Sequence, residues 1–199
     1  MTTKELEYAI NKHYFNFSKI ITTNLTRNSG VVSHECDVIV VTKANYLLEF
    51  ELKISKADLK NDFKKKHSHE CENIKKTYYV LPKELKDCVE LIPDKFGVII
   101  VDKKTWIDKS GKNPLEKTYY PLRIIREAQN NKAAKKINED QFIKICTLAS
   151  MRYWTCKENE LKNEGLIQWN KAKICDNCKN RSSKICRTCN NLNNWEGEK

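Results

Sequence analysis

The stretch HECDVIVVTKANYLLEFELKIS, residues 34 to 55, constrains the fold more than any other part of the chain. Its two β-rich runs, ECDVIVVT and YLLEFELKI, are separated by a short turn and predict a strand pair. Both runs are largely apolar, yet they carry Asp37, Glu49, Glu51 and Lys53. A buried ionised carboxylate is costly unless it is paired or holds a metal. These strands therefore either expose their acids to solvent or bury them with a charged partner or a metal ion.

The remaining pattern predicts a mixed α/β sheet flanked by helices. A first helix, KELEYAINKHYF, is expected with Thr3 as its cap, and a second, KADLKNDFKKKH, with Ser55 as its cap. Further strands are expected in KTYYVLP and FGVIIVD, and an irregular hairpin around Ser110 and Gly111. A long helix, beginning at NEDQFIK, is expected to end at Gly165.

Charge and hydropathy narrow the class of partner. The 199 residues include 37 Lys and Arg against 26 Asp and Glu, a formal net charge of +11 that favours an anionic partner such as nucleic acid or an acidic membrane surface. No apolar run is long enough to span a membrane, and the N-terminus lacks the apolar core of a signal peptide. We therefore expect a cytoplasmic protein with reduced thiols and no membrane partner.

The acids on the strand pair suggest a metal site. Side chains alternate along a strand, so Glu49, Glu51 and Lys53 share one face. If the two strands pair, an acid from each can converge at one end of the sheet, and two carboxylates form a hard oxygen site for Mg²⁺ or Mn²⁺. A neighbouring lysine suits activation of water and phosphodiester hydrolysis. The alternative is an amphipathic strand whose charged side chains face solvent.

Several segments together resemble a known family. HECDVIVV, EFELKISKADLKNDFKKKH, YYVLP and IPDKFGVIIVD are similar to the MmcB-related DNA repair family of the PD-(D/E)XK nuclease superfamily, over roughly residues 3 to 105. The resemblance implies a restriction-endonuclease-like fold, with Asp37 and Glu51 as the acids and Lys53 as the lysine of the motif. It also implies a catalytic glutamate on the first helix, for which Glu5 fits, with Glu7 as the weaker choice. The motif's proline is replaced by Cys36.

Other polar residues near this motif are less specific. The lysine-rich helix after Lys53 is expected to follow a phosphate backbone without reading base sequence, although a solvated helix face is the alternative. Its candidate contacts are Lys56, Lys60, Lys64, Lys65 and Lys66. For Glu49 the sequence leaves open a position beside the metal or a solvated one. His34, His67 and His69 are expected to be ordinary solvated histidines, and Cys36 a small buried residue.

The C-terminal segment CDNCKNRSSKICRTC carries the most specific motif of the chain. Two C-x₂-C pairs, which supply four thiolates to one tetrahedral ion, predict a structural Zn²⁺ site, with an iron–sulfur cluster as the alternative. The ligands would be Cys175, Cys178, Cys186 and Cys189. The apolar side chains of this tail are too few for a core, so the metal would hold it together. Arg181 and Arg187 are further candidates for contact with nucleic acid.

These features predict three parts: a nuclease-like core over residues 1–125, a helical extension over 126–165 and a zinc knuckle over 166–199. We expect a metal-dependent nuclease acting on DNA rather than RNA, in repair or processing. The alternatives are an accessory protein that binds nucleic acid without cleaving it, and an adaptor whose basic faces bind acidic proteins.

Overall fold

The computed structural model describes residues 1–63, 71–110 and 114–166. The four C-terminal cysteines, Arg181, Arg187, Lys64 to Lys66, His67 and His69 lie outside these ranges, so the predictions made for them stay predictions. Within the described residues, no helix is both long and apolar enough to cross a membrane.

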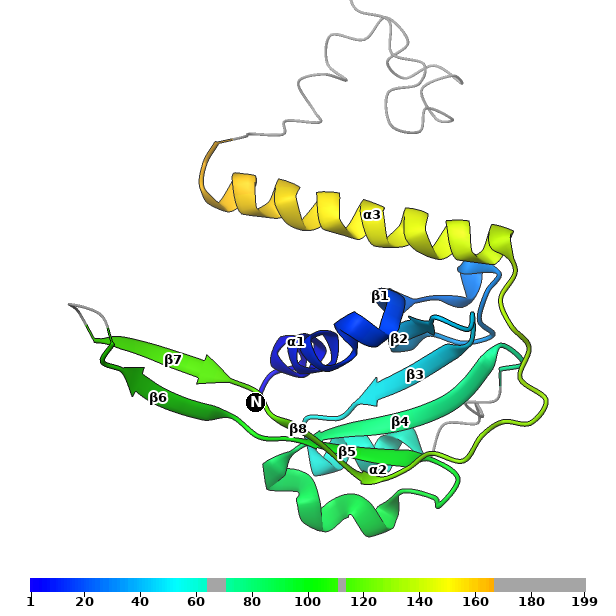
Figure 1. The fold of residues 1–199 in the computed structure, drawn as a ribbon, viewed down its shortest axis with the longest axis horizontal. Coiled ribbons are helices and arrows are strands. Elements are labelled where there is room, and N and C mark those ends of the chain that lie inside the picture. Colours follow the sequence, from blue (N-terminus) through cyan, green and yellow to red (C-terminus); the bar gives the residue numbers. More distant parts are fainter. Residues whose placement is uncertain (64–70, 111–113, 167–199) are drawn as a thin grey trace, which may run out of the picture. The chain divides into compact units, whose positions relative to one another are not determined.

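A six-stranded mixed sheet forms the centre of the protein, with the strand order β1-β2-β3-β4-β5-β8 (Figure 1). Strands β1 to β3 form an antiparallel meander, β3, β4 and β5 run parallel, and β8 closes the other edge in antiparallel orientation. The strands are β1 (Ser18–Leu25), β2 (Cys36–Thr42), β3 (Leu47–Leu52), β4 (Ile74–Pro82), β5 (Gly97–Val101) and β8 (Leu122–Arg126). The predicted mixed α/β class is confirmed.

The two faces of the sheet bury different side chains. Helix α1 (Thr3–Tyr14) packs Leu6 and Ile10 onto one face, against Val38 of β2 and Phe50 of β3. The crossovers from β3 to β4 and from β4 to β5 are helix α2 (Lys56–Asp62) and a 3₁₀ helix, Lys83–Leu91, which touch each other. Two successive crossovers in one direction lie on one side of a parallel sheet because such connections are right-handed.

The face opposite α1 carries two separate apolar clusters. One gathers around Tyr79 and Leu81 of β4 with Leu59 of α2, and the other around Ile39 and Val41 of β2. Strand β3 lies between β2 and β4, so the side chains that β3 directs to this face lie between the two clusters. Those side chains are Leu47, which belongs to the cluster around Ile39, and then Glu49 and Glu51, with Lys53 just after the strand.

Several local expectations need correction. The cap of α1 is Thr2 rather than Thr3, and it forms a capping box with Glu5. Helix α2 begins at the predicted cap, Ser55, but ends at Asp62, earlier than predicted. The segment SKIITTNL, for which no element was predicted, forms β1 at the edge of the sheet. Its mix of Thr, Ser and Asn hides the alternation that normally identifies a strand.

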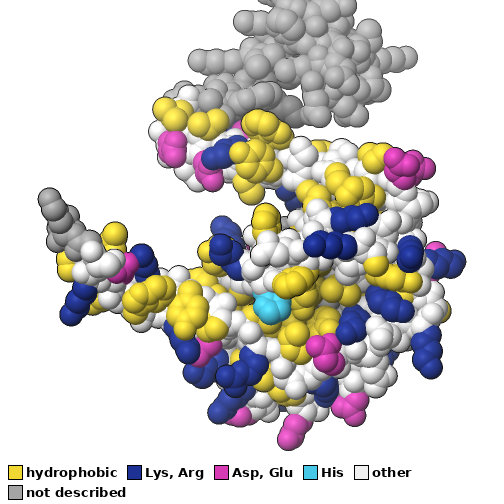
Figure 2. All heavy atoms as spheres, viewed as in Figure 1, with side chains coloured by type: hydrophobic (Ala, Val, Ile, Leu, Met, Phe, Trp, Pro, Cys, Tyr) yellow, Lys and Arg dark blue, Asp and Glu magenta, His cyan; other side chains and the backbone are white. Residues whose placement is uncertain are grey.

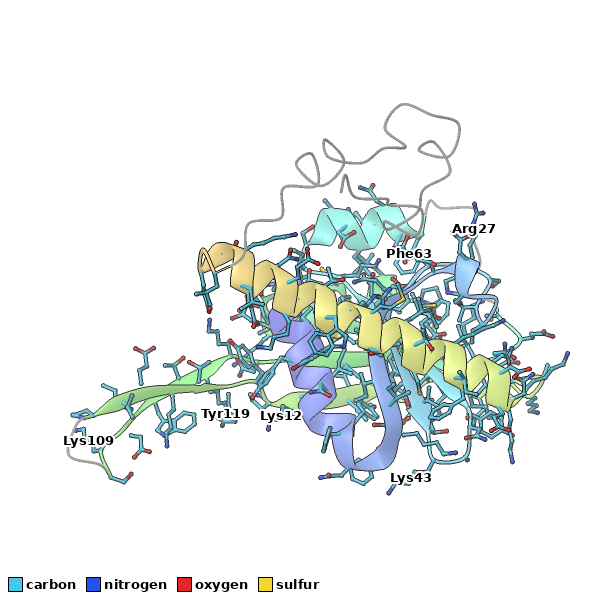
Figure 3. The ribbon with its side chains drawn as sticks, turned by 90° about the horizontal axis from the view of Figure 1, so that it is seen from above. Lys12, Arg27, Lys43, Phe63, Lys109 and Tyr119 are labelled. Carbon is cyan, nitrogen blue, oxygen red and sulfur yellow. The ribbon has the colours of Figure 1, made fainter. Side chains whose placement is uncertain are left out.

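A two-stranded hairpin between β5 and β8 forms a sheet of its own. Its strands are β6 (Lys104–Asp108) and β7 (Leu115–Tyr119), and it projects away from the central sheet (Figure 1). Lys109 lies toward the tip and Tyr119 toward the base (Figure 3). Every residue of both strands is exposed except the half-buried Asp108. The hairpin that the sequence predicted around Ser110 is confirmed.

The long helix predicted near the C-terminus is also confirmed, as α3 (Glu139–Asn163), and Gly165 adopts the left-handed conformation that ends it. Its first half packs Ile145 into the cluster around Ile39, with Phe142 and Leu148 beside it. Internal contacts divide the chain into two units, 1–151 and 152–199, and this division falls inside α3. The boundaries predicted at residues 125 and 165 stay predictions.

Candidate functional site

Asp37 and Glu51 lie on neighbouring strands, β2 and β3. These strands pair antiparallel, with Val38 opposite Phe50 at the end where both acids lie. The Asp37 side chain reaches across to β3, where its Oδ2 accepts a hydrogen bond from the Leu52 backbone N–H at 2.9 Å. Asp37 therefore contacts the backbone next to Glu51, and the convergence of the two carboxylates stays a prediction.

Glu51 and Lys53 lie in a buried polar network. The side chains of Glu51 and Lys53 are both buried. The Lys53 Nζ atom lies 3.2 Å from Glu51 Oε2 and 3.1 Å from Asp62 Oδ1. The Tyr79 hydroxyl donates to the other Asp62 oxygen at 2.7 Å. Burial lowers the pKa of Lys53, but the Glu51 and Asp62 carboxylates outweigh it and leave the pKa raised. The lysine is therefore held charged between two acids.

Burial of these charges excludes the interpretation in which they face solvent. An ordinary amphipathic strand would leave Glu49, Glu51 and Lys53 exposed, whereas their exposed fractions are 0%, 5% and 4%. Burying an ion pair seldom stabilises a protein more than apolar residues of the same volume would. The network therefore adds little to the stability of the fold beyond what apolar residues in the same positions would add.

The two glutamates of the first helix have different surroundings. The Glu5 carboxylate accepts hydrogen bonds from the Thr2 cap, from Lys103 Nζ at 2.8 Å and from the Tyr120 hydroxyl at 2.8 Å. Lys103, the Thr2 backbone and Tyr120 lower the pKa of Glu5 to about 2. Burial, followed by repulsion from Asp37, raises the pKa of Glu7. Glu5 thus has structural partners, and Glu7 lies close enough to Asp37 for their charges to repel; a catalytic part for either glutamate stays a prediction.

A third group of side chains lies one strand repeat from Glu51. Glu49 is fully buried, forms an ion pair with His34 Nε2 and accepts a hydrogen bond from the Thr77 hydroxyl at 2.8 Å. One donor atom each from His34, Cys36 and Glu49 lie within 4.8 Å of one another. Burial and the nearby Glu49 and Glu51 carboxylates raise the pKa of the Cys36 thiol. His34 is thus not the ordinary solvated histidine that the sequence predicted, and Glu49 is not solvated.

The basic side chains are spread over several elements. Lys56 and Lys60 of α2 are exposed, as a contact with phosphate requires. The β6–β7 hairpin adds four exposed lysines, namely Lys103, Lys104, Lys109 and Lys117, next to exposed Trp106 and Tyr119. On the face seen in Figure 2, Lys and Arg lie in several groups rather than in one patch. Any contact with an anionic polymer would therefore involve more than one element.

Sequence reasoning missed Asp62, Tyr79 and Thr77, which hold the charged side chains in place. Each of them belongs to a residue type that is common at the surface, and no local pattern places it beside β3. The Glu5 assignment had a usable signal, because Thr2 and Glu5 have the T-x-x-E spacing of a capping box.

Comparisons with known proteins add information about the fold. No protein-family model matches the chain, and no curated protein is significantly similar to it. Among solved structures, it is similar to a protein of unknown function from Silicibacter pomeroyi, with a TM-score of 0.54 and 18% sequence identity. The match covers 80% of this chain and 94% of that one. At this identity the likeness concerns the fold alone.

Proposed function

We propose that the protein is a metal-dependent nuclease of the restriction-endonuclease-like kind that hydrolyses DNA phosphodiester bonds. The observation that carries the proposal is a pair of acids on neighbouring strands, half-buried Asp37 and buried Glu51, with the charged Lys53 ammonium group 3.2 Å from Glu51. Their residue types and order match the motif that the sequence resembles. A role in DNA repair or processing is part of the proposal.

The donor atoms suit a hard divalent cation. Asp37 uses Oδ2 to accept the Leu52 N–H, so Oδ1 is the atom through which it would bind an ion. Glu51 would supply the second carboxylate, and the set contains oxygen donors of the kind that Mg²⁺ and Mn²⁺ prefer. A bound cation would lower the pKa of a water molecule and stabilise charge on the phosphate.

Each protein side chain has a separate part in this proposal. Asp62 and Tyr79 hold Lys53 in one position, which fixes its ammonium group beside Glu51. Lys53 would orient the attacking water and offset negative charge on the phosphate. Glu7, whose pKa is raised by burial and by Asp37, would shift toward its charged form when a cation binds nearby.

Binding to DNA would rest on exposed lysines away from the buried set. Lys56 and Lys60 lie three and seven residues after Lys53, so phosphates held by α2 would lie close to the site. The β6–β7 hairpin, with its lysines and exposed Trp106, would form a second contact, because a two-stranded ribbon fits the major groove of DNA. Such contacts release counterions, so affinity should fall steeply as salt rises.

The test is cleavage of linear, circular and branched DNA with Mg²⁺ or Mn²⁺ and with EDTA. Asp37→Asn should abolish cleavage, because it removes charge that holds the ion with little change of shape. Glu5→Gln is the matched control and should retain cleavage, since Glu5 binds Thr2, Lys103 and Tyr120. Both variants should bind DNA like the wild type. If the wild type cuts no substrate, or Asp37→Asn cuts as well as the control, the proposal is wrong.

One observation favours a second candidate function. Lys53 already has two acidic partners and is 4% exposed, which is also what a nuclease fold retained without catalysis would show. In that case the protein would be an accessory that binds nucleic acid. It would then bind DNA with the same salt dependence but show no metal-stimulated cleavage in the wild type.

A further inference from the structure

We propose that His34, Cys36 and Glu49 form a zinc-binding site, separate from the pair of acids Asp37 and Glu51. The three side chains come from the start of β2, the loop before it and the middle of β3. One donor atom from each lies within 4.8 Å of the others. The inference concerns Zn²⁺ and stands whether or not the protein is a nuclease.

The donor set matches the preference of zinc. Imidazole nitrogen, thiolate sulfur and carboxylate oxygen are its three usual protein ligands, and borderline-soft Zn²⁺ accepts all of them together. Ligand atoms around one tetrahedral zinc lie roughly 3.3–3.8 Å apart. A separation within 4.8 Å therefore needs only a small movement of the side chains. Mg²⁺ is disfavoured here because it seldom takes sulfur or nitrogen ligands.

Two of the three donor side chains also make the outer hydrogen bonds that are typical of metal ligands. The His34 Nδ1 atom, on the far side of the ring from Nε2, lies 3.4 Å from the Ser33 hydroxyl. The second Glu49 oxygen accepts a hydrogen bond from Thr77 at 2.8 Å, while the first contacts His34. Such outer hydrogen bonds orient a ligating histidine or carboxylate and raise its affinity for the metal.

The three donors gather at one buried place. Cys36 belongs to the apolar cluster around Ile39, and its thiol also lies beside His34 and the fully buried Glu49. A zinc ion would use all three donors and leave a fourth position for water on the side of His34, whose side chain is 13% exposed. By joining the loop before β2 to β3, the ion would also hold Asp37, the next residue after Cys36, in position.

The experiment is zinc content and zinc affinity of the full-length protein, purified with zinc and dialysed. The C-terminal cysteines are present in every variant, so their contribution cancels in the differences. His34→Gln and Cys36→Ser should each hold one zinc equivalent fewer than the wild type. Cys88→Ser is the matched control, because Cys88 is a buried thiol in the apolar cluster around Tyr79. It should hold as much zinc as the wild type.

Two further variants keep the outcome decisive. Thr77→Val retains all three ligands and should weaken zinc binding by about 10- to 100-fold in competition with a chelator. Asp37→Asn should leave zinc content unchanged even though it removes the proposed Mg²⁺ ligand, so the two proposals can fail separately. Equal zinc content in the wild type, His34→Gln, Cys36→Ser and Cys88→Ser would overturn the site.

Discussion

Strands β3 and β5 flank the same strand, β4, and both run parallel to it, yet they are built from different side chains. All five residues of β5, GVIIV, are buried, and none of them is charged. Five of the six residues of β3, LLEFEL, are buried, and two of those five are glutamates. Since both strands occupy equivalent places in one sheet, the fold does not require acids at this depth. The acids of β3 are therefore not required by the fold, and they are the residues on which the proposed metal sites depend.

Substitutions in the two strands should destabilise the protein for different physical reasons. In β5 steric crowding restricts which side chains fit, because the ring of Tyr78 lies over Gly97 and leaves no room for a methyl group. In β3 charge balance restricts substitution, because Glu51 is buried beside Lys53 and Lys53 is buried beside Asp62. A substitution at Lys53 tests the charge balance, and one at Gly97 tests the steric crowding.

Replacing Lys53 by Met should have the largest effect on stability. The change leaves Glu51 and Asp62 buried without their common cation, and breaking a buried pair in this way costs about 3–5 kcal/mol. Urea unfolding with EDTA present measures the free energy of unfolding. The control is Lys83→Met, which removes only an exposed pair with Asp102 and should change little. Equal small losses in both variants would mean that the buried network contributes nothing.

Replacing Gly97 by Ala should destabilise β5 by an intermediate amount. The new methyl group would lie 2.2 Å from the Tyr78 ring and 2.8 Å from the Ala128 backbone nitrogen. The ring cannot move aside easily, because it stacks on Phe50 and its hydroxyl donates to Glu127. Overpacking of this kind costs about 1–3 kcal/mol, which urea unfolding would detect. An unchanged unfolding midpoint would show that steric crowding does not restrict substitution in β5.

Replacing Glu7 by Gln should have the smallest effect, and of opposite sign. The pKa of Glu7 is raised in the folded protein, so the folded state binds more protons than the unfolded state just above the ordinary pKa, and stability falls as pH rises there. Removing the charge should stabilise the metal-free protein by less than about 1 kcal/mol at neutral pH, since Glu7 is partly exposed. The gain should vanish below about pH 4, where the glutamate is protonated in both states. A loss of stability at pH 7 would contradict the repulsion by Asp37.

The contrast between β3 and β5 also explains what the sequence could predict. Strands β2, β3, β4 and β5 followed from apolar runs, and the choice of Asp37 and Glu51 as the two acids followed from the family resemblance. The partners of Lys53 did not, because Asp62 and Tyr79 come from separate elements that meet only in the folded sheet. Likewise, whether Glu5 or Glu7 approaches Asp37 depends on how α1 is rotated on the sheet, which is set by tertiary packing.

The sequence alone also could not predict which metal ion each acid of β3 would bind. Glu49 has the same alternation as Glu51, so the sequence placed both on one face. It could not show that the loop before β2 and the first residue of β2 bring His34 and Cys36 to Glu49, while Glu51 contacts Lys53. Neighbouring acids on one strand thus serve two different groups of side chains, one with sulfur and nitrogen donors and one with oxygen donors.

The most direct test of the central claim is the position of Mn²⁺ in crystals of the full-length protein, located by anomalous scattering. The account predicts a peak bound by the carboxylates of Asp37 and Glu51, with the Lys53 ammonium group close by and not among the ligands. No peak at these two carboxylates in crystals soaked with Mn²⁺, or a peak found only at His34, Cys36 and Glu49, would contradict it.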